Sequence, residues 1–316
     1  MIYDIFMIGA EIGLLYGPLA LGIYLAMNIM SLPDLTLEGS FGLGGAATAA
    51  SIVAGVNPLV AFFIGMAVGA GAGMITAFLH VLLQMNVLLA GILMTTAAWS
   101  VSLAIMGTGN VALMDHTTLF SWTESMGLDN QMSMVVVGAL VTLFFAVVLL
   151  LYLQTGFGLA ARATGLNIQT ARSLGIKTEL HQVVGLMIAN ALAAASGALV
   201  AQSQGFMDVS IQSGVIVVGL AALVIGTSIV RTNNLVVSVA SVILGVVVYR
   251  CLVALSLRIG ISPNYVRLLT AVLVFVVVAM RIHGDGLFSG LSSEGRKRRK
   301  RKRVQFLEND RVANLF

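Results

Sequence analysis

Long apolar segments separated by short polar stretches set the pattern of this 316-residue chain. A helix needs about 20 apolar residues to cross a bilayer, so the pattern predicts an all-α polytopic membrane protein with about eight to ten transmembrane segments. The main predicted segments are residues 5–30, 57–83, 87–106, 132–153, 183–201, 214–230, 235–255 and 264–281. Gly17-Pro18 is expected to kink the first of them.

The apolar pattern breaks between the first two of these segments and resumes as a short helix of small residues, 41–56. Pro33 is expected to end the preceding helix, because it cannot donate a backbone hydrogen bond. The break carries alternating polar residues, Asp34, Thr36, Glu38 and Ser40. Two interpretations stay open: a half-helix beside a transport pathway, and an interfacial loop whose acids offset a helix dipole.

A second polar interruption occupies residues 154–182, between two long apolar segments. Asn167 can cap a short helix of about two turns, residues 168–174. Gly175 is expected to end that helix, and Thr178 to cap the helix that re-enters the membrane. The local pattern predicts a short structured helix between two spans.

The surface of this polar interruption has two notable features. Small residues at Ala161, Ala163 and Ala171 would let another protein approach closely, and basic residues would face acidic groups of a partner. These basic residues are Arg162, Arg172 and Lys177. From the residues alone, an amphipathic loop that lies on lipid headgroups is slightly favoured over a surface for a partner protein.

Composition excludes a soluble fold, because 59% of the residues are hydrophobic and only 9% are charged, against about 25% in soluble domains. The formal net charge of +4 arises from a basic run at residues 296–303. We expect residues 1–290 to form the membrane domain and residues 291–316 a cytoplasmic tail. A basic run after a transmembrane helix favours contact with anionic lipid over nucleic acid.

Charge also predicts which ends of the helices face the cytoplasm. Four crossings separate residues 154–182 from the basic tail, which places both in the cytoplasm by the positive-inside rule. Residues 107–131, which lack Lys and Arg, and residues 202–213 are then external. The N-terminus is external if residues 41–56 span, and internal if they are re-entrant. Similar ends in residues 42–53 and 219–230 hint at inverted repeats.

No catalytic or metal-binding pattern occurs. None of the lysines lies in a G-x-x-x-x-G-K-[ST] sequence, and the four histidines lack the spacing of metal ligands. We therefore expect no enzyme activity, no metal and no cofactor in this chain. The candidate lining of a solute path is weakly polar, which favours a neutral or zwitterionic solute: Asp34, Thr36, Glu38, Ser40, Thr48, Thr95, Thr96 and Asn190.

Three motifs resemble one group of transport proteins. The pattern R-A-T-G-x-N-x-x-x-A-x-x-x-G-I begins at Arg162 and is followed by N-A-L-A-A-A-S-G-A-L from Asn190. Residues 33–40 and the Gly-flanked residues 219–226 supply the other two motifs. Together they resemble ABC-importer permeases of the branched-chain amino-acid and ribose group, especially amino-acid permeases that pair with aromatic amino-acid binding proteins. The resemblance covers most of residues 31–281.

The resemblance implies a homodimer or a pair of permeases, cytoplasmic ATPase subunits that bind ATP and Mg²⁺, and an external substrate-binding protein. The solute, with an amino acid favoured, would move inward by alternating access across a bacterial cytoplasmic membrane. Residues that would couple to the ATPase are Arg162, Ala163, Gly165, Asn167, Ala171, Arg172, Gly175 and Lys177.

Two other functions stay open. An ion-coupled secondary transporter could use Asp34 and Glu38 as its ion or proton site. A scaffold that lipid recruits through the basic tail would transport nothing.

Overall fold

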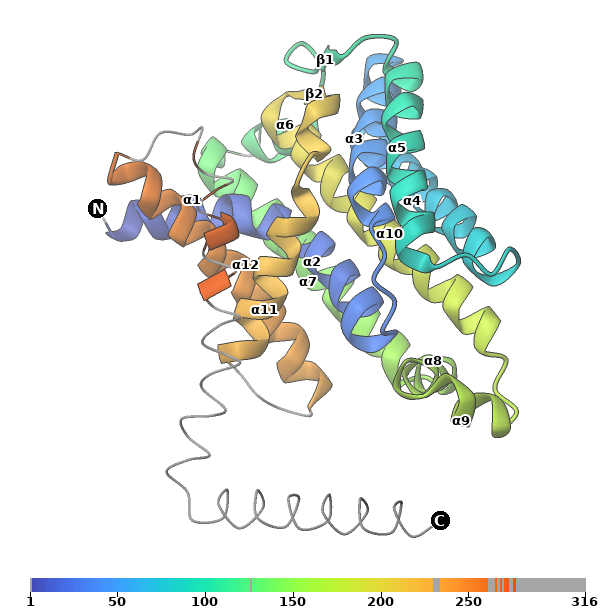
Figure 1. Cartoon of the computed structure of the whole chain (residues 1–316). Helices are drawn as coiled ribbons and strands as arrows, with labels where there is room; N and C mark the ends of the chain where they lie inside the picture. The colour runs from blue at the N-terminus through green and yellow to red at the C-terminus, as the bar shows by residue number, and fades with distance from the viewer. Residues whose placement is uncertain are drawn as a thin grey trace, which may run out of the picture. The chain divides into compact units, whose positions relative to one another are not determined.

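The computed structural model describes residues 2–125, 127–229 and 234–260, and also residues 265, 268, 270–272 and 275–276. Helices make up nearly all of this described part (Figure 1). In chain order the elements are α1 (Ile2–Leu15), α2 (Gly17–Ile23), the π-helix η1 (Tyr24–Ile29), α3 (Thr36–Val53), α4 (Pro58–Val81), α5 (Val87–Met106), β1 (Asn110–Ala112), α6 (Leu119–Ser125), α7 (Asn130–Gln154), α8 (Gly156–Leu166), α9 (Ile168–Ser173), α10 (Thr178–Gln204), β2 (Phe206–Asp208), the 3₁₀ helix η2 (Val209–Gln212), α11 (Val215–Ile229) and α12 (Leu235–Arg258).

Six segments of the described chain are long and apolar enough to cross a membrane: α4, α5, α7, α10, η2 with α11, and α12. The first helix adds a seventh if its two bent halves count as one span. The all-α polytopic membrane fold is therefore confirmed. Most of the predicted last helix, residues 264–281, and the basic tail lie outside the described residues, and the inverted repeats stay a prediction.

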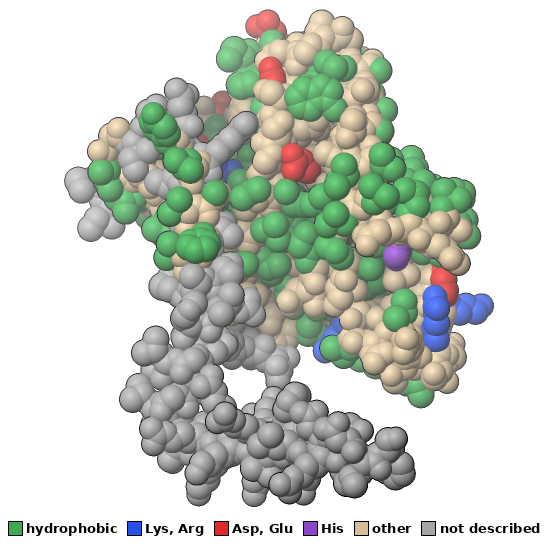
Figure 2. Space-filling model, in the orientation of Figure 1, with side chains coloured by type: hydrophobic (Ala, Val, Ile, Leu, Met, Phe, Trp, Pro, Cys, Tyr) green, Lys and Arg blue, Asp and Glu red, His purple; other side chains and the backbone are tan. Residues whose placement is uncertain are grey.

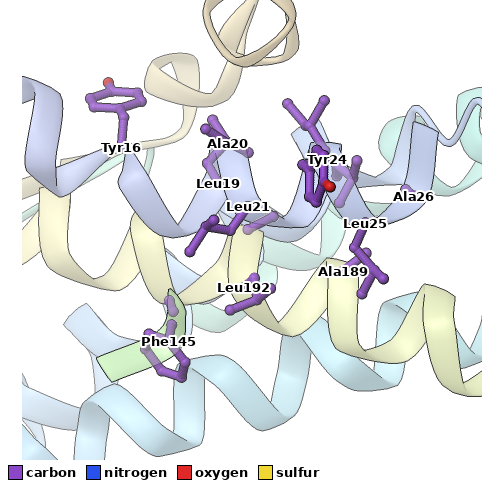
Figure 3. Close-up of a cluster of buried hydrophobic side chains, with 14 of the residues drawn as sticks. Tyr16, Leu19, Ala20, Leu21, Tyr24, Leu25, Ala26, Phe145, Ala189 and Leu192 are labelled. Carbon is purple, nitrogen blue, oxygen red and sulfur yellow. The ribbon is translucent and has the colours of Figure 1, made fainter. Parts of the chain in front are cut away.

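The first helix bends by 55° between its halves, at the Gly17-Pro18 pair that the sequence identifies. Pro18 cannot donate to the preceding turn, which leaves the helical ladder open there. Beyond the bend, α2 and η1 are buried between other helices. Figure 3 shows side chains of this segment pointing toward Phe145 of α7 and toward Ala189 and Leu192 of α10.

Helix α3 starts at Thr36, five residues before the predicted start of the short helix. The backbone N–H of Thr36 donates to Oδ1 of Asp34 at 2.8 Å, which satisfies a donor that the first helical turn leaves free. Thr36, Glu38 and Ser40 therefore lie in the helix, and the expectation of a loop through Ser40 was wrong. The N-cap residue of α3 is Leu35, which makes no side-chain capping bond, so the N-capping expected of the acids is not observed, and Asp34 binds the Thr36 N–H from one position further out.

Helix α10 lies centrally among the described helices and packs against α2, α3 and α4 (Figure 1). Glycines every four residues along α4 make this packing close. A methyl group at Gly69 would collide with Ala194, and one at Gly73 with the carbonyl of Leu186. Without water to drive apolar surfaces together, such close backbone approach supplies much of the attraction between membrane helices.

The two polar segments predicted to be external meet in space. Residues of β1 pair antiparallel with β2, with Asn110 opposite Asp208. Hydrogen bonds from the hydroxyl and backbone N–H of Ser210 lower the pKa of Asp208, so this carboxylate stays charged. Figure 1 shows these strands at one end of the described helices, and α8 and α9 at the opposite end. The structure thus separates two polar ends, joined by apolar helices.

Candidate functional site

Helices α8 and α9 form a capped pair between α7 and α10, which we call the α8–α9 segment (residues 155–177). The side chain of Thr155 accepts from the backbone N–H of Gly158 at 3.1 Å. The side chain of Asn167 accepts from the backbone N–H of Thr170 at 3.0 Å and so caps α9, as predicted. Gly175 has a φ of +81°, which confirms the predicted helix stop. The sequence analysis missed α8, although Thr155 before a run of helix-compatible residues is a start signal.

The small residues of this segment face the chain itself. Ala161 and Ala171 are buried, so the expectation that they leave room for another protein was wrong. A methyl group at Gly165 would collide with the carbonyl of Ile29, which shows how closely α8 approaches η1. Ala163 is half-buried. Large apolar side chains point outward instead, because Leu166 and Leu174 are 88% and 74% exposed.

The basic residues of this segment differ in their exposure and in their bonds within the chain. Arg172 donates to Oγ1 of Thr178 at 3.0 Å and forms an ion pair with Glu179 at 2.5 Å, so its guanidinium binds within the chain. Thr178 accepts that bond as the first residue of α10 and does not cap the helix, which corrects the prediction. Lys177 is exposed and Arg162 is half-buried.

A second group of polar residues is buried where α3, α4 and α10 meet. We call Asp34, Thr36, Ser40, Thr76 and Asn190 the Asp34 cluster; all five are fully buried. The side-chain amide of Asn190 donates to Oδ2 of Asp34 at 2.7 Å and to the carbonyl of Leu186 at 2.9 Å. Its Oδ1 accepts from the hydroxyl of Ser40 at 2.7 Å.

The hydroxyl groups of the cluster are also paired. Those of Thr36 and Thr76 lie 2.7 Å apart, and Thr76 donates in turn to the carbonyl of Ala72. Helix α5 closes over the turn before α3, because Thr95 donates to the carbonyl of Leu35 at 2.8 Å. In this conformation the cluster is a closed hydrogen-bond network that ties four helices together. Thr76, which the sequence analysis missed, carries no motif that would have identified it.

The other predicted path residues lie apart from the cluster. Glu38 is half-buried and accepts from the backbone N–H of Gly214 at 2.8 Å, where α11 begins. Thr48 donates to the carbonyl of Ala61 between α3 and α4. Thr96 is exposed, and its hydroxyl donates to Ile92 of its own helix. The eight candidates therefore do not line one continuous surface in this structure.

Within the residues that the structure describes, no three His, Cys, Asp or Glu side chains are grouped as a metal site would require. On the face shown in Figure 2, most basic side chains gather at the α8–α9 end and most acidic ones at the end that carries the strands. Apolar side chains cover much of the surface between.

Comparison with known proteins identifies the family. Residues 6–278 match the family described as the permease component of the branched-chain amino acid transport system. The chain belongs to this family. It is therefore a multi-pass membrane protein and a non-catalytic transport component, as the resemblance implied.

Three relatives illustrate the range of the family. The chain is 32% identical over 262 residues to a tyrosine transport system permease protein of Clostridioides difficile, covering 83% of this chain and 86% of the relative. It is 33% identical over 277 residues to an uncharacterized protein of Rickettsia prowazekii, with 86% and 96% covered. An autoinducer 2 import system permease protein of Yersinia enterocolitica is 31% identical over 185 residues, which span 55% of this chain and 51% of that protein. No solved structure matches the chain.

Proposed function

We propose that this chain is the membrane-spanning subunit of an ATP-driven importer, and that it moves a neutral or zwitterionic amino acid inward across a bacterial cytoplasmic membrane. Its partners would be a cytoplasmic ATPase, which binds ATP and Mg²⁺, an external substrate-binding protein and a second permease copy. The similarity to a tyrosine permease favours an aromatic amino acid as the solute.

The observation that carries this proposal is the geometry of the α8–α9 segment. It is short, capped at both helix starts, and exposes Leu166 and Leu174 beside Lys177. Because α8 packs against α7, α10 and η1, a push on α9 would reach three membrane helices through rigid contacts. We assign the docking of the ATPase to this surface, with Arg162, Ala163, Gly165, Asn167, Ala171, Arg172 and Gly175 shaping it.

The opposite end would receive the binding protein. The paired β1 and β2 and helix α6 form a structured surface there, with the charged Asp208 on it. This assignment puts α9, the chain's C-terminus and its basic tail in the cytoplasm, where the tail (residues 291–316) would meet anionic lipid.

Labelling from one side of the membrane tests the orientation. The only cysteine is Cys251, so Cys251→Ser gives a cysteine-free background. Ser173→Cys in α9 should react with a membrane-impermeant maleimide only from the cytoplasmic side, and Asp115→Cys only from outside. Both residues are exposed in the structure. The reverse pattern would refute the orientation, and with it the docking of an ATPase at α9.

Reconstitution tests the function. The full-length chain is placed in proteoliposomes alone, or with the ATPase and binding protein encoded beside it, and uptake of radiolabelled L-tyrosine and L-leucine is measured. We expect uptake of one or both that requires ATP and both partners. Uptake by the chain alone, driven by a proton or sodium gradient, would overturn the proposal in favour of an ion-coupled transporter. The closed bonding of Asp34 argues against that alternative.

A further inference from the structure

Arg250 is a charged residue inside the membrane-spanning helix α12. It lies eight residues before the end of that helix at Arg258, which is about 12 Å along the axis. A charged side chain within a membrane span opposes insertion, so such residues are rare and mark functional sites. The sequence analysis treated Arg250 only as a mild exception to the charge rule.

The surroundings of Arg250 leave its donors underused. Its guanidinium carbon lies 4.0 Å from the centre of the Tyr16 ring. The Nε atom is buried and has no hydrogen-bond partner, and no acidic side chain in the described part of the chain forms an ion pair with Arg250. A cation–π contact attracts the guanidinium but satisfies none of its five N–H donors.

Tyr16 connects this arginine to the bend of the first helix. It immediately precedes Gly17, where the helix direction changes, and its ring stacks on that of Phe41 in α3 at 5.6 Å. The hydroxyl end of Tyr16 points away from helix α10 in Figure 3. Arg250 therefore lies against the residue at which the first helix is broken.

We propose that Arg250 binds the carboxylate of a transported α-amino acid. This inference rests on the function proposed above and names the chemistry of the site. A guanidinium pairs with a carboxylate through two parallel hydrogen bonds, and the Tyr16 ring holds the guanidinium in place. Because the site adjoins the bend, movement of α2 relative to α1 would open or close it.

Replacement of Arg250 in the reconstituted complex tests the proposal. Arg250→Met keeps the apolar length and removes the charge of a half-buried side chain, so a merely packing role predicts unchanged stability and uptake. Recognition of a carboxylate predicts that L-tyrosine or L-leucine uptake falls by at least about tenfold, as expected for a lost charge-assisted bond. Arg250→Lys should retain part of the uptake, because lysine supplies charge without the planar fork.

Two controls accompany these variants. Arg258→Met, at the exposed end of the same helix, should transport as the wild type does. Thermal melting of each purified full-length variant separates recognition from folding.

The outcomes are distinct. Uptake by Arg250→Met within about twofold of the wild type would overturn the proposal, since a lost charge-assisted bond is worth more. So would equal losses in Arg250→Met and Arg250→Lys with both proteins melting early, because that result assigns Arg250 a structural role. If the wild type moves neither amino acid, the proposed function fails first, and the failure is visible before any variant is compared.

Discussion

The Asp34 cluster and the α8–α9 segment are both polar interruptions of an apolar chain, yet the fold treats them in opposite ways. The five residues of the cluster are fully buried and bond to one another across three helices. The α8–α9 segment keeps its bonds local, within a few residues of each cap, and exposes most of its side chains. One polar interruption thus forms a buried hydrogen-bond network that holds helices together, and the other forms an exposed surface.

The difference is energetic as well as geometric. A buried network exists in a low dielectric, where each bond is strong and each orphaned partner is destabilising. Exposed polar groups exchange their partners for water at little cost. The cluster should therefore control whether the protein folds, and the α8–α9 segment whether the folded protein couples to its partner.

The largest effect is expected from Asp34→Ala. It removes the acceptor of the Thr36 N–H and of one N–H of the Asn190 amide, and two orphaned buried donors should lower the free energy of unfolding by about 4 kcal/mol. Thermal melting in detergent and the yield of inserted protein measure it. Thr96→Val, at an exposed hydroxyl that bonds only within its own helix, is the control and should change stability by less than about 0.5 kcal/mol. Equal losses of stability in Asp34→Ala and Thr96→Val would refute the role of the Asp34 cluster in stabilising the fold.

The next effect concerns the packing of α4 on α10. Gly69→Val places a side chain where Ala194 already lies, and should destabilise by about 2–3 kcal/mol. Gly71→Val, two residues away, meets no atom within 4 Å and carries the same change in helix propensity. Chemical or thermal denaturation of both variants isolates the packing contribution. If the two variants have the same melting temperature, the close approach of α4 and α10 does not stabilise the fold.

A smaller effect on stability, but a large one on coupling, is expected from Gly175→Val. The φ of +81° strains any residue with a side chain, by about 1–2 kcal/mol. Gly55→Val has nearly the same φ, +84°, and is a matched control outside the α8–α9 segment. Both variants should insert, but only Gly175→Val should abolish ATP-driven uptake. Normal coupling in that variant would remove the case for α9 as the ATPase contact.

The smallest effect belongs to the Arg172–Glu179 ion pair. Both side chains are about half exposed, 57% and 48%, so water and salt screen their attraction. A double-mutant cycle with Arg172→Gln and Glu179→Gln should give a coupling energy below about 1 kcal/mol, which decreases further in high salt. A larger, salt-independent value would mean that the α8–α9 segment is as rigidly tied as the cluster.

Features that depend on neighbouring residues could be predicted from the sequence. Asn57 and Asn167 cap their helices, and Gly17-Pro18 marks the bend. The limits of α5 agree with the apolar pattern to the residue. Caps, stops and hydropathy are local properties, so a window of a few residues contains them.

Features that depend on which face of a helix is buried could not be predicted. Ala171 turns inward and Thr96 outward, although both are small residues in helices that meet other helices. Helices α5 and α10 both pass as membrane spans, yet 22% of one and 72% of the other is buried in the protein. Lipid and protein interior are alike to an apolar side chain, so hydropathy cannot distinguish them.

The sequence by itself determined that this chain is a polytopic helical membrane protein with a capped polar segment between two spans. Only the tertiary structure decided the partners of its polar groups: Asn190 meets Asp34 across 156 residues, and Arg250 meets Tyr16. The physical reason is that a polar group inside an apolar medium must find its partner wherever the fold provides one. That partner is set by the packing of distant helices, which no local pattern encodes.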